Sequence, residues 1–188
     1  IVSAQQGNFF FFFITSSNGL SANTVFCITQ DSRGFLWVGT YEGLNRFDGN
    51  TFKIFTNELN DSLSLSANTI YAIEEDSKGD LWIGTYPGGL NKFNRRTETF
   101  TRFAVDVSSN NAVSSENVYS LAVDNDDNIW IGTAFGLNKY LMNKKHFIKY
   151  FYDSTDVNSI SSDIISSLVY DEKRNFLWIG TKTGGLNK

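Results

Sequence analysis

The chain has 188 residues, enough for one domain with a buried core, and a formal net charge of −4. Lysine and arginine stand singly instead of forming a basic stripe, which excludes the electrostatic footprint of a nucleic-acid-binding surface. Aromatic residues make up 15% of the chain and there is 1 Pro, a composition that favours strands joined by tight turns and excludes a disordered chain.

Residues 9–14 form the first predicted element, an aromatic run of the kind expected in a strand. The run is far shorter than the roughly 20 apolar residues that cross a bilayer, so contact with a membrane is expected only through segments outside this chain. It precedes the first complete repeat described below. Its aromatic character makes it a candidate closing strand for a sheet that is missing one.

Four short runs follow, at residues 25–28, 36–40, 43–47 and 52–55, and each alternates apolar and polar side chains as a half-buried strand does. The first two runs are joined by a turn that opens with Asp31, a residue type that bonds its own backbone in turns. Such short, closely spaced runs predict one antiparallel sheet of four strands.

The same unit recurs along the rest of the chain. Its second run always carries a tryptophan in the pattern Leu/Ile-Trp-Val/Ile-Gly-Thr, and successive tryptophans lie 45, 48 and 48 residues apart. The repeats are assigned to residues 14–55, 56–103 and 104–150, with an incomplete fourth repeat at 151–188. The four tryptophans are Trp37, Trp82, Trp130 and Trp178.

A four-stranded sheet that is apolar on both faces must stack against sheets like itself, and the architecture that does this around an axis is the β-propeller. The predicted fold is therefore all-β, with about four blades that form part of a larger propeller. The tryptophans are expected to pack between blades. Because an open set of blades leaves unpaired edges and apolar faces, we expect self-association or contact with further blades of the propeller.

The repeats resemble the two-component regulator propeller family. The resemblance rests on residues 19–25, 31–40 and 43–49, which read Gly-Leu-Ser-Ala-Asn-Thr-Val, Asp-Ser-Arg-Gly-Phe-Leu-Trp-Val-Gly-Thr and Gly-Leu-Asn-Arg-Phe-Asp-Gly. It implies an extracytoplasmic, periplasmic sensor region of a hybrid two-component system, followed in the parent protein by kinase, receiver and DNA-binding modules. The resemblance also implies carbohydrate sensing.

Few residues of the sequence suggest catalysis or metal binding. His146 is the single histidine and has neither a second histidine nor a pair of cysteines with metal-ligand spacing. The acidic stretch Asp124–Asn128 has the wrong residues after it for a calcium loop and is interpreted as a hairpin turn. Cys27 aligns with small residues in the other repeats and is interpreted as a packing residue. We therefore predict no catalytic residues, no metal and no cofactor in this chain.

Binding residues are sought where the repeats differ, because positions that vary between copies are free to serve function. The turn after the second strand and the loop entering the first strand should open on one face of the propeller. Aromatic rings beside amides and carboxylates suit a sugar, whose C–H faces stack and whose hydroxyls exchange hydrogen bonds. The candidate ligand-binding residues are Tyr41, Glu42, Tyr86, Phe135, Lys182, Asn23, Asn68, Glu116 and Asp163.

The leading functional hypothesis is a ligand-sensing propeller that recognises an oligosaccharide and belongs to a sensor histidine kinase. One alternative is the propeller of a glycan-processing enzyme, of the lyase or sialidase type, whose catalytic residues lie outside this chain. A second alternative is a structural module for dimerisation. Turnover of a glycan would favour the enzyme, and silence toward all ligands would favour the structural module.

Overall fold

The computed structural model describes residues 10–188, which form four antiparallel sheets in the order of the sequence. Three sheets have four strands, and the fourth has three. The first blade contains β1 (Val25–Gln30), β2 (Leu36–Thr40), β3 (Gly43–Phe47) and β4 (Phe52–Phe55), preceded by a 3-10 turn at Ser16–Asn18. The second contains β5 (Thr69–Glu75), β6 (Leu81–Tyr86), β7 (Gly89–Asn94) and β8 (Thr99–Arg102).

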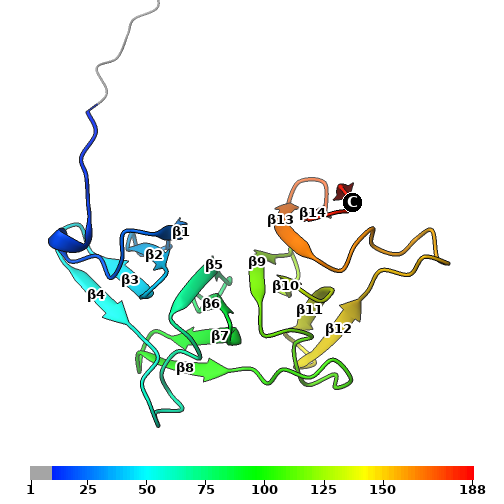
Figure 1. Ribbon diagram of the computed structural model, residues 1–188, viewed down its shortest axis with the longest axis horizontal. Helices are drawn as coiled ribbons and strands as arrows, with labels where there is room; N and C mark the ends of the chain where they lie inside the picture. The colour runs from blue at the N-terminus through cyan, green and yellow to red at the C-terminus, as the bar shows by residue number, and fades with distance from the viewer. Residues whose placement is uncertain (1–9) are drawn as a thin grey trace, which may run out of the picture.

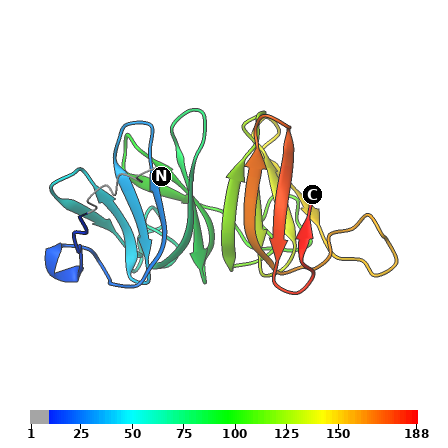
Figure 2. The same ribbon diagram turned by 90° about the horizontal axis from the view of Figure 1, so that it is seen from above.

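The third blade contains β9 (Val118–Val123), β10 (Ile129–Thr133), β11 (Leu137–Leu141) and β12 (His146–Tyr150), and the fourth contains β13 (Ile165–Asp171), β14 (Phe176–Thr181) and β15 (Leu186–Asn187). The blades stand side by side in an open arc, with β1, β5, β9 and β13 along its inner side (Figure 1). Seen from above, each sheet is stacked against the next (Figure 2). The prediction of an all-β propeller segment is confirmed.

The tryptophans lie between blades because each indole has both a large apolar surface and one N–H group that needs a partner when buried. Trp37 is fully buried, in a core that includes Ile70 and Phe93 of the second blade. Its indole N–H donates to the carboxylate of Asp31 at 2.7 Å. Trp82 and Trp130 donate to the equivalent aspartates at 2.9 and 3.1 Å. Each of these tryptophans therefore packs between blades and also holds the aspartate that opens the turn before its strand.

The fourth blade departs from this scheme. Asp171 lies seven residues before Trp178, one more than in the other blades, and its carboxylate accepts from Arg174 instead of from the indole. Trp130 and Trp178 are also only partly buried. The longer turn between β13 and β14 therefore changes the partner of the aspartate without changing the strand order.

In the first three blades, the glycine two residues after the tryptophan, within the same strand, lets the neighbouring blade approach closely. A Cβ atom at Gly39 would lie 2.8 Å from the side chain of Ile70, and one at Gly84 would lie 2.6 Å from Val118. Contacts this short are not tolerated between carbon atoms in a packed core. Glycine is thus required here by the neighbouring blade.

A buried amide holds the loop that enters each blade. In every blade an asparagine of the third strand accepts a hydrogen bond from the backbone N–H of a serine in that loop and donates to the hydroxyl of the same serine, over distances of 2.7–3.0 Å. The pairs are Asn45 with Ser21, Asn91 with Ser66, Asn138 with Ser114 and Asn187 with Ser161. Because both polar groups find partners, the buried amide is not left unsatisfied.

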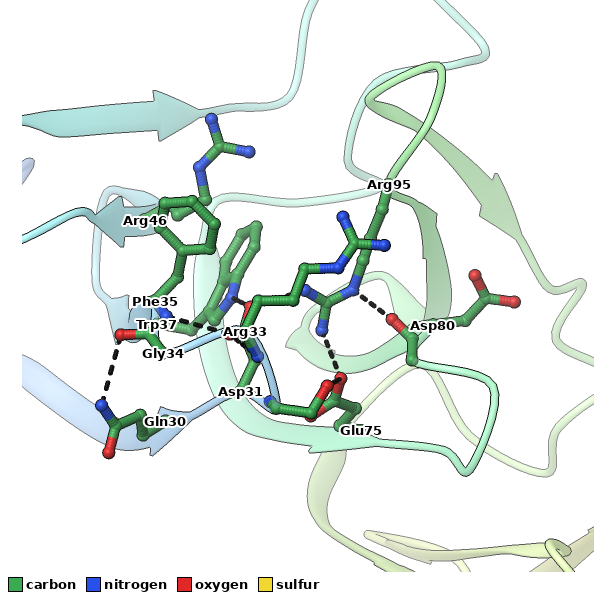
Figure 3. Close-up of polar contacts among 12 residues, drawn as sticks. Gln30, Asp31, Arg33, Gly34, Phe35, Trp37, Arg46, Glu75, Asp80 and Arg95 are labelled. Carbon is green, nitrogen blue, oxygen red and sulfur yellow. Dashed lines mark hydrogen bonds and ion pairs between the residues drawn. The ribbon is translucent and has the colours of Figure 1, made fainter.

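An arginine ties the first blade to the second (Figure 3). The guanidinium of Arg95 lies 2.5 Å from the carboxylate of Asp31 and 2.7 Å from that of Glu75. Burial alone would raise the pKa of Asp31, but the hydrogen bonds from Trp37 and Arg95 outweigh it and lower the pKa. The carboxylate therefore stays ionised while it accepts from both partners.

Residues 10–14 do not pair with any strand of the described chain, and the sheet of the fourth blade remains three-stranded. The predicted closing strand at 9–14 is thus not formed within this arc, and Phe9 lies outside the described residues. The side chains of Phe10, Phe11, Phe12 and Phe13 are 78–88% exposed.

Candidate functional site

The first strand of every blade has a β-bulge at its third or second residue. The ladder between β5 and β6 skips Tyr71, since Ile70 pairs with Thr85 and Ala72 with Gly84. A bulge turns its side chain away from the direction that regular alternation would give, and bulges are common beside binding sites. The skipped residues in the four blades are Phe26, Tyr71, Tyr119 and Ser166.

The bulges bring aromatic rings of neighbouring blades together. The rings of Phe26 and Tyr71 stack with centroids 4.5 Å apart, and Tyr71 meets Tyr119 edge to face at 5.7 Å. The ring of Tyr86, the last residue of β6, has its centroid 5.8 Å from that of Tyr71 and 6.3 Å from that of Tyr119. These four residues, which we call the axial aromatic row, lie at the inner side of the arc where β1, β5 and β9 adjoin.

A hollow of about 370 Å³ adjoins the axial aromatic row between the second, third and fourth blades. Its walls come from the bulge residues, from the turns after β10 and β14, and from the loop that enters β13. The lining residues are Tyr71, Tyr119, Ala134, Ile164, Ser166 and Lys182. This is a concave, partly apolar surface with a few polar groups, the combination that small ligands occupy in proteins.

The polar groups of the hollow are two tyrosine hydroxyls, one serine hydroxyl and one ammonium. Burial, together with the hydroxyls of Tyr86 and Tyr71, raises the pKa of Tyr119, so its hydroxyl remains a hydrogen-bond donor around neutral pH. The backbone of Lys182 is fixed by a bond from its N–H to the carbonyl of Ile164 at 2.9 Å. No carboxylate of residues 10–188 lies within ion-pair distance of the Lys182 ammonium.

Two of the residues predicted from the sequence take part in this arrangement. Tyr86 belongs to the axial aromatic row, and Lys182 lines the hollow. Tyr41 and Glu42 occupy the corresponding turn of the first blade and are exposed, and the carbonyl of Tyr41 accepts from Thr69. Phe135 packs against Phe151 with ring centroids 5.4 Å apart.

The amides and carboxylates predicted for the entering loop have structural partners. Asn23, Asn68 and Asp163 each accept a hydrogen bond from a backbone N–H earlier in the same connecting segment, at 2.6–2.8 Å. The backbone carbonyl of Glu116 accepts from both Gly88 and Gly89. These four residues shape the loop, and none of them lines the hollow.

Phe26, Tyr71 and Tyr119 were not among the candidates chosen from the sequence, because they stand inside a run that looks like an ordinary strand. The signal that could have found them is their common place in the repeat. Each follows the first aliphatic residue of the first strand, and three of the four repeats have an aromatic residue there.

Residues 10–188 contain no group of three or more histidine, cysteine, aspartate or glutamate side chains placed to hold a metal ion. The acidic stretch at Asp124 is a turn, in which its carboxylate accepts from the backbone of Asp126 and Asn128. Within the same residues, no helix has the length and apolar character that a membrane span requires.

Fold and site together define a β-propeller segment whose repeated positions build the blades and whose variable axial positions surround a hollow. The model of the two component regulator propeller matches residues 19–42, 64–86 and 112–135, one segment in each of the first three blades. The matched segments of the first three blades are thus similar to two-component regulator propeller repeats.

Individual proteins agree with this assignment. Histidine kinase P4 of Formosa agariphila is 52% identical over 63 residues, which are 34% of this chain and 5% of that protein. An extracellular domain assigned to a hybrid two component system of B. thetaiotaomicron superimposes with a TM-score of 0.80 at 28% identity, over 93% of this chain and 24% of that one. The chain thus spans a small part of each relative and is similar to an extracellular domain of a two-component system.

A streptogramin B lyase superimposes with a TM-score of 0.61 over 90% of this chain and 55% of its own, at 16% identity. An identity this low shows a shared propeller fold alone.

Proposed function

We propose that this chain is part of the periplasmic ligand-sensing propeller of a hybrid two-component sensor, and that the hollow beside the axial aromatic row binds an oligosaccharide. The observation that carries the proposal is the row itself. Four blades use the same bulge to present a side chain toward the axis, and three of those side chains are aromatic.

The chemistry of the hollow suits a sugar. Tyrosine rings offer flat apolar faces for the C–H faces of a pyranose, and their hydroxyls, with Ser166, offer hydrogen-bond donors and acceptors. Phe26 extends the aromatic surface into the first blade, so more than one sugar unit has a ring to stack on. An oligosaccharide uses such an elongated surface better than a single sugar does.

In the parent protein, ligand occupancy is relayed to a histidine kinase that controls transcription. A ligand shifts such an equilibrium only if it binds one arrangement of the sensor more tightly than the other. The hollow is bounded by three blades, and a ligand that spans them would favour the arrangement in which the blades are held together.

Isothermal titration calorimetry with a panel of neutral and acidic oligosaccharides tests the proposal. Wild-type chain should bind at least one member, and Tyr119→Ala should weaken that binding at least tenfold. The control is Tyr152→Ala, because Tyr152 is 51% exposed and lines a different hollow, formed by residues 149–160. The sugar site would be contradicted if the wild-type chain bound no member of the panel, or if both variants weakened binding equally.

A further inference from the structure

The junctions on the two sides of the second blade differ in how their outer halves are held. Each has an apolar core around a tryptophan, with Trp37 between the first and second blades and Trp82 between the second and third. Both indoles are buried, and each donates its N–H to the aspartate of its own turn. Because the two tryptophans have the same place in the repeat, the contacts around them can be compared position by position.

The first of these junctions is closed by charged side chains that reach across it. Glu98 of the second blade accepts from Arg46 of the first at 3.0 Å and also pairs with Lys53. Arg95 of the second blade lies 2.5 Å from Asp31 of the first (Figure 3). A network of several charges holds two elements together better than isolated exposed pairs do.

The second junction has other residues at both of these positions. The turn between β11 and β12 matches the turn between β7 and β8, because the N–H groups of Lys145 and Glu98 each donate to the carbonyl four residues earlier. Both residues also have a positive φ, 56° and 55°. Lys145 therefore stands at the position of Glu98, and Met142 stands at the position of Arg95.

No ion pair of residues 10–188 joins the second blade to the third. Asp76, the equivalent of Asp31, takes its cation from Lys92 of its own blade, at 3.4 Å. Hydrogen bonds to the third blade come from the backbone N–H groups of Gly88 and Ser77, in the two turns that flank β6. These bonds hold the inner strands and leave the outer half of the junction without a polar tie.

The apolar layer of the second junction is also less completely covered. At the first junction, Phe93 is fully buried beside Trp37, with centroids 5.3 Å apart. At the second, the equivalent Tyr140 packs on Trp82 at 5.4 Å but is only partly buried, as is Phe103. Partial burial removes less apolar area from water, so it stabilises the contact less.

The axial aromatic row crosses this same junction. Tyr71 and Tyr86 belong to the second blade and Tyr119 to the third, and the centroid of the Tyr119 ring lies 5.7 and 6.3 Å from the other two. The hollow beside the row also has walls from both blades. A ligand that contacts both blades makes all its contacts only while the blades are together, so it favours the closed arrangement.

We propose that the outer halves of the second and third blades separate more readily than those of the first and second, and that an oligosaccharide bound at the axial aromatic row opposes this separation. The effect of the oligosaccharide rests on the proposed function, whereas the difference between the junctions does not. Occupancy of the hollow then changes the shape of the propeller at the junction that has no ion pair.

Hydrogen exchange of the indole N–H groups, followed by NMR, tests the difference between the junctions. A buried, hydrogen-bonded N–H exchanges with solvent only when its surroundings open. In the ligand-free chain, the indole of Trp82 should exchange about tenfold faster than that of Trp37. The variants Trp37→Phe and Trp82→Phe assign the two signals. Equal rates, or faster exchange at Trp37, would overturn the proposal.

Moving the ion pair to the second junction tests its cause. Thr101 has the place of Lys53, because each lies opposite the cation of the third strand. Thr101→Lys/Lys145→Glu should therefore slow exchange at Trp82 about threefold. The matched control Thr101→Lys/Lys144→Glu has the same net charge and should leave the rate unchanged. Equal effects of the two variants, or no effect of the first in a folded chain, would contradict the role of the ion pair.

The reverse change removes the ion pair from the first junction. Glu98→Lys places a third cation beside Arg46 and Lys53, so exchange at Trp37 should become about tenfold faster while the rate at Trp82 stays the same. Equal acceleration at both indoles would show that the whole chain is destabilised, and it would contradict opening at one junction.

The effect of the oligosaccharide is measured with the member of the panel that binds in calorimetry. At saturation it should slow exchange at Trp82 about tenfold and leave Trp37 unchanged. Equal slowing at both indoles, or slowing at neither, would overturn the coupling between the hollow and the junction. If no member of the panel binds, the proposed function fails and the coupling fails with it, whereas the two indoles of the ligand-free chain still decide whether the junctions differ.

Discussion

Each complete blade uses aromatic residues in two ways, and the tryptophans of the second strands can be compared with the rings of the axial aromatic row. Trp37 and Trp82 are fully buried, and each pairs its N–H with an aspartate. Phe26 and Tyr86 are 38% and 42% exposed and contact mainly other rings of the row. The buried set holds the blades together, whereas the exposed set is available to a ligand.

The largest expected effect on stability is at the buried set. Trp82→Ala removes a fully buried indole and leaves the carboxylate of Asp76 without that donor, so the free energy of unfolding should fall by about 3–5 kcal/mol. Denaturant titration measures the change. Tyr86→Ala, four residues along the same strand, serves as control and should cost less than about 1 kcal/mol. Equal losses of unfolding free energy in the two variants would contradict the distinction between the buried and the exposed set.

A smaller loss is expected at the buried amides. Asn91→Ala leaves the backbone N–H of Ser66 without its acceptor, which should cost about 2 kcal/mol of unfolding free energy. The double variant with Ser66→Ala should lose less than the sum of the two single variants, because the amide and the hydroxyl bond each other. Thermal or chemical unfolding of the single and double variants measures these losses. If the loss in the double variant equals the sum of the two single losses, the pair does not act as a unit.

A third expected effect is a dependence of stability on pH. Burial raises the pKa of Glu74 from 4.5 to about 7, so its neutral form is favoured in the folded chain. Its contribution to stability is fully present below pH 4.5 and is lost as the pH rises through about 7. The advantage of Glu74→Gln over wild type should therefore grow between pH 5 and pH 8. Unfolding curves at both pH values that show a constant difference would exclude this assignment.

The blades could be predicted from the sequence because the residues that build them repeat. The tryptophan, the glycine two residues after it and the asparagine of the third strand recur at fixed spacing, and in the first three blades each has a structural partner that also recurs. That the sheet of the fourth blade has three strands in the described chain also followed from this comparison.

The site could be predicted only in part. Tyr86 and Lys182 were found because they stand at the end of the second strand of their blades, where the sequence varies between repeats. Tyr71 and Tyr119 were not found, because a bulge changes the direction of a side chain without leaving a mark in the apolar alternation. Asn68 was chosen for its polarity, but its side chain accepts a hydrogen bond from the backbone N–H of Asn57, 11 residues earlier in the same loop.

The most direct test of the division between scaffold and ligand site measures binding and stability on the same variant. Saturation-transfer NMR with the oligosaccharide panel should give a signal on wild-type chain. The double variant Tyr71→Ala/Tyr119→Ala should lose that signal while its melting temperature stays within a few degrees of wild type. A double variant that still binds, or one that loses its signal only because it unfolds, would contradict the account.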